Sequence, residues 1–133
     1  MKKKIVICSS VSFWKEINEW KEKLKNDNYQ VIKYPEQFTG EFLPNYEIEF
    51  SEHYQKISET DIVFVLNVKK NDKKGYIGAS VFAEIAFAIG LNRAYNKNIK
   101  VYCLNKFTNS LPYYEELKYW EQLGWLNYCP IKR

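Results

Sequence analysis

The segment DIVFVLNV, residues 61–68, decides the fold of this chain. After its first residue it is an unbroken apolar run up to Asn67, and most of the run is β-branched. A strand with one face in water alternates apolar and polar residues instead. The run therefore predicts a strand that is buried on both faces, as in a parallel sheet covered by helices.

Other segments resemble this strand in character. KIVIC at 4–8 and IKVYCLN at 99–105 are short, apolar and rich in β-branched residues. YQVIKY at 29–34 has similar composition and ends before a proline. The short apolar segment WLNYCPI at 125–131 is expected to add a fifth strand.

Helical patterns lie between these strands. Phe13, Ile17 and Leu24 recur at helical spacing after the first strand. The other expected helices run over about 50–59, 80–94 and 112–123. This alternation predicts a single α/β domain over residues 1–133, with a parallel sheet, right-handed crossovers and helices on both faces.

Composition narrows the class of protein. The chain has 133 residues, of which 46% are hydrophobic and 27% charged, as in one globular domain. A net charge of +4 is too small and too dispersed for a polynucleotide binder. No apolar segment is long enough for a membrane span, and the apolar part of MKKKIVICSS is too short for a signal peptide. We therefore expect a cytoplasmic protein.

The cysteines give no metal signature. Cys8, Cys103 and Cys129 have no CxxC spacing, and the chain contains one histidine. This pattern predicts free thiols in a reducing compartment and no zinc or other metal site.

The expected sheet also predicts where a ligand binds. In open parallel sheets, ligands bind beyond the carboxyl ends of the strands, beside the point where strand order reverses. Three loops should meet there: residues 8–12, the loop after Tyr34, and residues 67–80. Residues 36–47 are read as irregular and are rich in aromatic side chains. They suit either a flap beside the pocket or simple surface packing.

Glu84 is the conspicuous residue of GYIGASVFAEIAFAIG, residues 75–90, because it is the single carboxylate in an apolar helix. An unpaired buried carboxylate is costly. Glu84 is therefore expected near the helix start as an ionised side chain. There it either stabilises the helix dipole or acts as a nucleophile or general base in the crevice.

Several of these segments, taken in order, resemble the nucleoside 2-deoxyribosyltransferase family and its deoxynucleoside 5′-monophosphate N-glycosidase relatives. The segments are KIVICSSVSF at 4–13, DIVFVLNV, a glycine-containing loop followed by EIAFAIG at 84–90, and IKVYCLN. We expect a three-layer, flavodoxin-like (Rossmann-like) sheet of five parallel strands in the order 2-1-3-4-5. The resemblance also implies a homodimer or higher homo-oligomer that uses no cofactor.

The resemblance further implies an enzyme that cleaves or transfers at the N-glycosidic bond of a nucleoside or its 5′-monophosphate. Glu84 matches the nucleophile, and Asp72 or Asn67 would assist as the second group. Retaining glycosyl chemistry of this kind needs two acidic groups close together. The residues expected to shape the substrate pocket are Cys8, Ser9, Ser10, Gly75, Tyr76, Gly78 and Ser80.

Other interpretations stay open at this point. A nucleotide-binding sensor or partner module would keep the same crevice without turnover. A related Glu-dependent glycohydrolase would act on NAD-like or nucleoside monophosphate substrates. His53, as a lone histidine, is more typical of a structural residue than of a catalytic one. The lysines at 69, 70, 73 and 74 suit a solvated loop or the steering of a 5′-phosphate.

Overall fold

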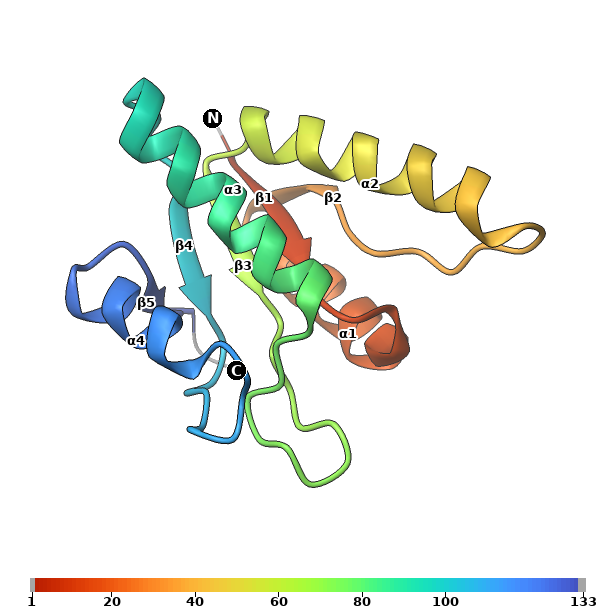
Figure 1. The fold of residues 1–133 in the computed structure, drawn as a ribbon. Helices are drawn as coiled ribbons and strands as arrows, with labels where there is room; N and C mark the ends of the chain where they lie inside the picture. Colours follow the sequence, from red (N-terminus) through yellow and green to blue (C-terminus); the bar gives the residue numbers. More distant parts are fainter. Residues whose placement is uncertain (1, 132–133) are drawn as a thin grey trace.

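The computed structural model describes residues 2–131 and contains one five-stranded parallel sheet in the order β2-β1-β3-β4-β5. The strands are β1 (Lys3–Cys8), β2 (Tyr29–Lys33), β3 (Ile62–Val65), β4 (Lys100–Cys103) and β5 (Asn127–Tyr128). The helices are α1 (Trp14–Asn26), α2 (Phe42–Glu59), α3 (Ala79–Tyr95) and α4 (Tyr114–Gln122), and a short 3-10 turn, Val11–Phe13, precedes α1. The predicted fold class and strand order are confirmed (Figure 1).

Helices cover both faces of the sheet because side chains along each strand point alternately to either side. On β1, Ile5 and Ile7 pack in the cluster that includes α1. Val6 and Cys8 point the other way, into the cluster formed with α2, α3 and α4. All four side chains are fully buried, which explains why this strand reads as a continuous apolar run.

The strand order reverses beside β1, which pairs with β2 on one side and with β3 on the other. The chain leaves β1 for β2, at the sheet edge, and then crosses to β3 and continues to β4. The loops after β1 and β3 therefore diverge to opposite faces, and their divergence opens a crevice at the carboxyl ends of these strands. Side chains at the end of β1 that face α2 and α3 are placed at its floor.

Helix α2 begins at Phe42, eight residues before the expected start at Phe50. The expectation of an irregular segment over residues 36–47 is therefore wrong for residues 42–47. Pro44 is tolerated because it lies in the first turn, where backbone N–H groups have no partner within the helix. Aromatic rings one turn apart then pack along the helix, with centroids 5.5 Å apart for Phe42 and Tyr46 and 4.2 Å for Tyr46 and Phe50.

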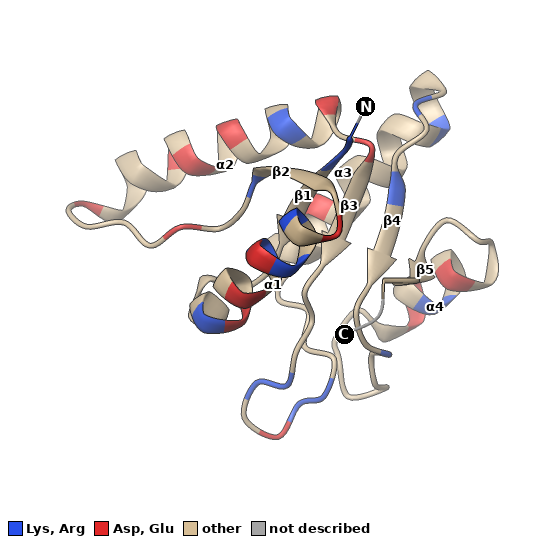
Figure 2. Ribbon diagram, turned by 180° about the vertical axis from the view of Figure 1, so that it is seen from behind, with Lys and Arg blue, Asp and Glu red and all other residues tan. Residues whose placement is uncertain are grey.

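Charged residues are frequent along α1 and α2 and on the loop between β3 and α3, where Figure 2 shows a run of basic positions. None of the helices in the described part of the chain is both long enough and apolar enough to cross a membrane.

The loop between β3 and α3 is fixed by a close backbone contact at Gly75. This residue has φ +62°, and a β-carbon added to it would overlap the carbonyl oxygen of Lys106 and lie 2.9 Å from Cα of Phe107. Only glycine adopts this conformation and permits this approach without strain. The contact holds the loop against the segment that follows β4.

Replacing Gly75 with alanine is expected to lower the free energy of unfolding by about 2 kcal/mol or more, from left-handed backbone strain plus the displaced segment. Gly90 is the matched control, since it lies within α3 and a β-carbon there meets nothing within 4 Å. Gly90→Ala should instead stabilise by about 0.5–1 kcal/mol. Urea unfolding of both variants measures the difference, and equal effects would contradict this account of the loop.

Candidate functional site

A cavity of about 350 Å³ opens at the carboxyl end of the sheet. Residues from all three predicted loops line it, and α2 supplies one wall. The loop residues are Ser9, Ser10, Val11, Pro35, Glu36, Phe38, Tyr76 and Gly78. The expectation that these loops meet at one crevice is confirmed.

Glu84 lies at the floor of this cavity and is 4% exposed. It is the sixth residue of α3, which begins at Ala79, so it belongs to the second helical turn. Burial raises the pKa of Glu84 to about 8; a hydrogen bond from Cys8 opposes this increase, and the charge of Glu49 adds to it. The expectation of an ionised carboxylate at the helix start is not supported, because burial favours the protonated form of this carboxyl group.

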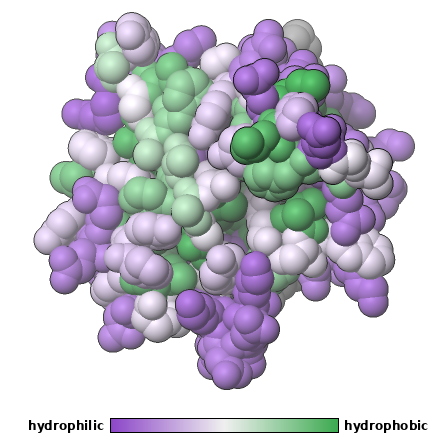
Figure 3. All heavy atoms as spheres, turned by 45° about the vertical axis from the view of Figure 1, so that its right-hand side comes forward, coloured by the Kyte–Doolittle hydropathy of each residue, from purple (hydrophilic) through white to green (hydrophobic). Residues whose placement is uncertain are grey.

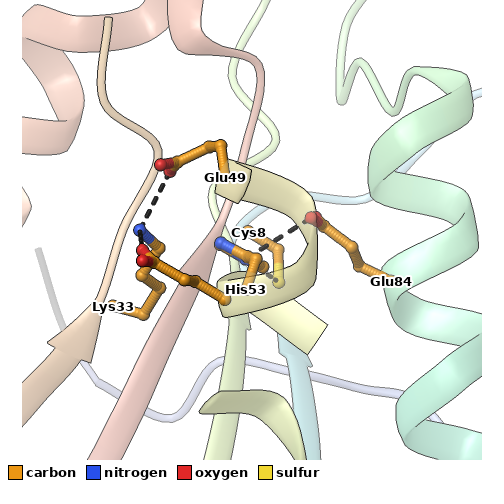
Figure 4. A network of polar contacts seen from close by, with 6 residues as sticks. Cys8, Lys33, Glu49, His53 and Glu84 are labelled. Atoms are coloured by element: carbon orange, nitrogen blue, oxygen red, sulfur yellow. Dashed lines mark hydrogen bonds and ion pairs between the residues drawn. The ribbon is translucent and has the colours of Figure 1, made fainter. Parts of the chain in front are cut away.

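His53 is the direct neighbour of Glu84. It comes from α2, is 3% exposed, and places Nε2 3.5 Å from Oε2 of Glu84 and 3.4 Å from Sγ of Cys8. Figure 4 shows the imidazole between these two groups, so one ring nitrogen serves both. Burial lowers the pKa of His53 to about 4, and the positive charge of Lys33 contributes.

The pKa shifts of Glu84 and His53 have the same physical cause and together indicate which protonation state the buried pair favours. Burial disfavours the charged form of each group, so the Glu84–His53 pair favours a neutral carboxyl group and a neutral imidazole, which together carry one acidic proton. Burial and the charge of Glu84 raise the pKa of the Cys8 thiol well above its ordinary value, so it stays protonated. Burying a neutral carboxyl group, a neutral imidazole and a neutral thiol costs much less free energy than burying the corresponding ions.

Helix α2 is also tied to the opposite side of the cavity through Lys33 at the end of β2. Nζ of Lys33 lies 3.0 Å from Oε1 of Glu49 and 3.5 Å from Oε2 of Glu52 (Figure 4). Glu49 lines the cavity, whereas Lys33 does not. The cavity wall therefore presents the carboxylate, and the cation lies behind it.

The structure does not bring the two expected assisting residues to Glu84. Asn67 is 1% exposed, and its side chain donates to the backbone oxygen of Asn105 at 2.7 Å and accepts from the backbone N–H of Asn105 at 3.0 Å. Asp72 is exposed in the turn closed by Lys70 and Lys73. Neither residue lines the cavity.

Of the residues expected to shape the substrate pocket, some line the cavity and others do not. Ser9, Ser10, Tyr76, Gly78 and Ser80 line the cavity. Ser9 also donates to the backbone oxygen of Leu66 at 2.9 Å, and the side chain of Ser10 accepts from the backbone N–H of Ser12.

The remaining two lie deeper or elsewhere. Cys8 lies below the floor against His53, and Gly75 packs on the segment after β4.

Sequence reasoning left the role of His53 open because the residue lies 31 positions before Glu84. One available signal was its helical phase. His53 precedes Ile57 by four residues, and side chains at this spacing share one helix face. Ile57 is fully buried, so its face is the one that packs on the sheet. A histidine on that face needs a polar partner from another element, and the carboxyl group of Glu84 provides it.

The same cluster contains three residue types that can act as metal ligands. Cys8, His53 and Glu84 each offer a donor atom, and these atoms lie within 4.8 Å of one another. His53 Nε2 contacts both other groups directly. The three side chains thus form a continuous polar cluster in which a proton can be exchanged.

Comparison with known proteins adds no family assignment. No protein-family model matches the chain, and no curated protein matches its sequence. The resemblance to nucleoside 2-deoxyribosyltransferases therefore stays a prediction from the residues.

The buried pair should make stability depend on pH between 6.5 and 8. Stability gained from the raised pKa of Glu84 is present below pH 4.5 and is lost as pH rises to about 8. Stability gained from the lowered pKa of His53 is present above pH 6.5 and is lost as pH falls to about 4. The two slopes oppose each other between 4.5 and 6.5, so only Glu84 acts from 6.5 to 8.

We expect the free energy of unfolding to fall from pH 6.5 to 8 by up to about 1.4 kcal/mol per pH unit. Glu84→Gln should remove this slope, because glutamine resembles the neutral carboxyl group and does not titrate. Urea unfolding at both pH values measures it. Glu47→Gln, at an exposed position on α2, is the control and should keep the slope. A slope that persists in Glu84→Gln would contradict the assignment.

Proposed function

We propose that this protein cleaves or transfers at the N-glycosidic bond of a nucleoside or its 5′-monophosphate, with Glu84 as the nucleophile. The observation that carries the proposal is the position of Glu84. Its carboxyl group is buried at the floor of the cavity, at the strand-order reversal, with a proton acceptor at 3.5 Å. A positioned carboxylate with an adjacent base is the arrangement that nucleophilic catalysis requires.

The dimensions of the cavity support a small substrate. A volume of about 350 Å³ lies within the range of small-molecule sites. Three small residues, Gly78, Ala79 and Ser80, form the rim where α3 begins. They leave space for a sugar ring to reach Glu84, one turn further into the helix.

A neutral Glu84 must lose its proton before it can act as a nucleophile, and His53 is the neighbouring group that can accept this proton. In the proposed reaction the proton of Glu84 moves to Nε2 of His53, and the resulting carboxylate attacks the anomeric carbon. The bond from that carbon to the base nitrogen breaks, its electron pair leaves with the base, and the base takes up one proton from the solvent. The imidazolium of His53 returns its proton to the solvent, so no net proton is gained or lost. Water then cleaves the glycosyl ester, releases the sugar and restores the carboxyl group. A second base in place of water would give transfer.

A non-catalytic nucleotide-binding module is the second candidate. It is favoured by the positions of Asp72 and Asn67, because neither lines the cavity that contains Glu84. A family-like site without its second acid would still bind a nucleoside. It would not release the base.

Chromatographic detection of free base tests the two candidates. The protein is incubated with deoxynucleosides, ribonucleosides and their 5′-monophosphates, with and without a second base. We expect release or exchange of a base, and a loss of at least about 100-fold in Glu84→Gln. Glutamine preserves the shape of the neutral carboxyl group, so this variant should fold and still bind substrate.

His53→Gln should lower the rate by about 100-fold, since the proton acceptor is removed while the nucleophile remains. Glu115→Gln, at an exposed position on α4 remote from the cavity, is the control and should keep full activity. Ligand-induced increases in melting temperature without any base release would favour the binding module. Activity that survives in Glu84→Gln would refute the proposed nucleophile.

A further inference from the structure

The charges that line the cavity all have one sign. The carboxylates of Glu36 and Glu49 line it, and none of the described lysines or arginines does so. Glu84 also lines it, but burial favours its neutral form. Lys33 lies behind Glu49 and is shared with Glu52. The wall around a bound ligand is therefore net negative, a poor environment for a phosphate and a favourable one for a cation.

The lysine-rich loop does not change this balance. It lies between β3 and α3. Tyr76 and Gly78 of this loop line the cavity, while the lysines at 69, 70, 73 and 74 do not. Figure 3 shows this loop as a hydrophilic projection at the bottom of the molecule. The ammonium group of Lys70 lies 4.8 Å from the ring centroid of Tyr76, on the loop itself.

Aromatic side chains form a continuous row along the same wall. Phe38, Phe42, Tyr46 and Phe50 all line the cavity. The first two ring centroids are 5.9 Å apart, and the last two are stacked at 4.2 Å. Phe42 is 62% exposed, so the row continues from the cavity to the surface. Figure 3 brings this side of the molecule forward and shows hydrophobic residues at its surface.

The carboxylates of the cavity wall and the row of aromatic rings together favour a planar cation as the ligand. Aromatic faces attract a positive charge through their quadrupole, and carboxylates beside them add direct attraction. A neutral base would gain stacking alone. A ligand with a positively charged heteroaromatic ring would use both features.

The positions of the acid groups favour the same ligand class. The nucleophile and the leaving base stand on opposite faces of the anomeric carbon, and His53, 3.5 Å from Glu84, lies on the side of the nucleophile. The other titratable groups that line the cavity are Glu36, Glu49, Tyr46 and Tyr76; Lys33, Cys8 and Tyr54 lie around the buried pair without lining it. Apart from Glu84 and His53, the cavity wall thus offers carboxylates and phenols, whereas the departure of a neutral base would need a readily available proton.

From these observations we infer that the preferred substrate is a nucleoside whose base is already a cation, an N-substituted pyridinium or an N7-alkylated purine. The inference rests on the proposed function and names the substrate class of that site. When the bond to the anomeric carbon breaks, its electron pair neutralises the positive nitrogen, and the base departs without taking up a proton. Glu84 forms the glycosyl ester, and hydrolysis by water then releases the sugar and one proton.

Matched pairs of nucleosides test the inference by binding. Nicotinamide riboside is compared with its neutral 1,4-dihydro form, and 7-methylguanosine with guanosine, by calorimetry on Glu84→Gln. Binding is measured rather than rate, because a cationic base is an intrinsically better leaving group with any catalyst. We expect the cation of each pair to bind about 10-fold more tightly, with a preference that falls as salt concentration rises.

Two variants identify the source of the preference. Glu49→Gln and Glu36→Gln, each combined with Glu84→Gln, should reduce the cation preference several-fold and leave the affinity for the neutral partner unchanged. Glu36 is exposed and makes none of the ion pairs of the described residues, so its replacement does not threaten folding. Glu115→Gln in the same background should keep the full preference.

The possible results separate this inference from the proposed function. Equal or tighter binding of the neutral nucleosides would overturn the inference, as would a preference that persists without both wall carboxylates. Release of base from neutral deoxynucleosides alone, dependent on Glu84, would overturn it while the proposed function stands. Selective binding of the cations without release of any base would reject the proposed function and the substrate inference that rests on it, and would leave the site as a cation-binding pocket.

Discussion

The contact between Glu84 and His53 is the interaction on which the site depends, because it sets how α2 and α3 meet above the end of β1. Both side chains are nearly inaccessible to water. A buried carboxyl group without a polar partner would be costly, and so would an unpaired imidazole. Each provides the partner of the other, and their mutual contact closes the floor of the cavity. Removing either side chain would leave the other buried with the thiol of Cys8 as a weaker polar partner.

Helices α2 and α3 form different parts of the cavity. Helix α3 supplies the floor, with Glu84 and the small residues of its first turn. Helix α2 supplies the wall, since Tyr46, Glu49, Phe50 and His53 recur at intervals of three and four residues and so share one helical face. The proposed nucleophile thus lies on α3, while most of the aromatic row and the proposed proton acceptor His53 lie on α2. Changes along the outer part of α2 can therefore alter the cavity wall without moving Glu84.

The strands and Glu84 were predictable because their signals are local. Unbroken apolar runs follow directly from burial on two faces, and a single carboxylate in an apolar helix is conspicuous within one segment of sequence. The start of α2 was not predictable from its proline, because a proline is compatible with a first turn as well as with a loop. The position of Asp72 depends on how the turn between Lys70 and Lys73 directs its side chain outward. The partnership of His53 with Glu84 depends on how two helices pack, which no local pattern in the sequence specifies.

A carboxyl group whose burial favours the protonated form is an unusual choice for the proposed nucleophile, yet its burial has a second consequence. The low polarity that raises the pKa of Glu84 also strengthens the attraction between its carboxylate and any positive charge nearby. In glycosyl transfer that charge develops on the sugar as the bond to the base breaks. Under the proposed function, the ionised state of Glu84 is disfavoured before a substrate binds and would be stabilised most in the transition state. This differential stabilisation is the form of binding energy that accelerates a reaction.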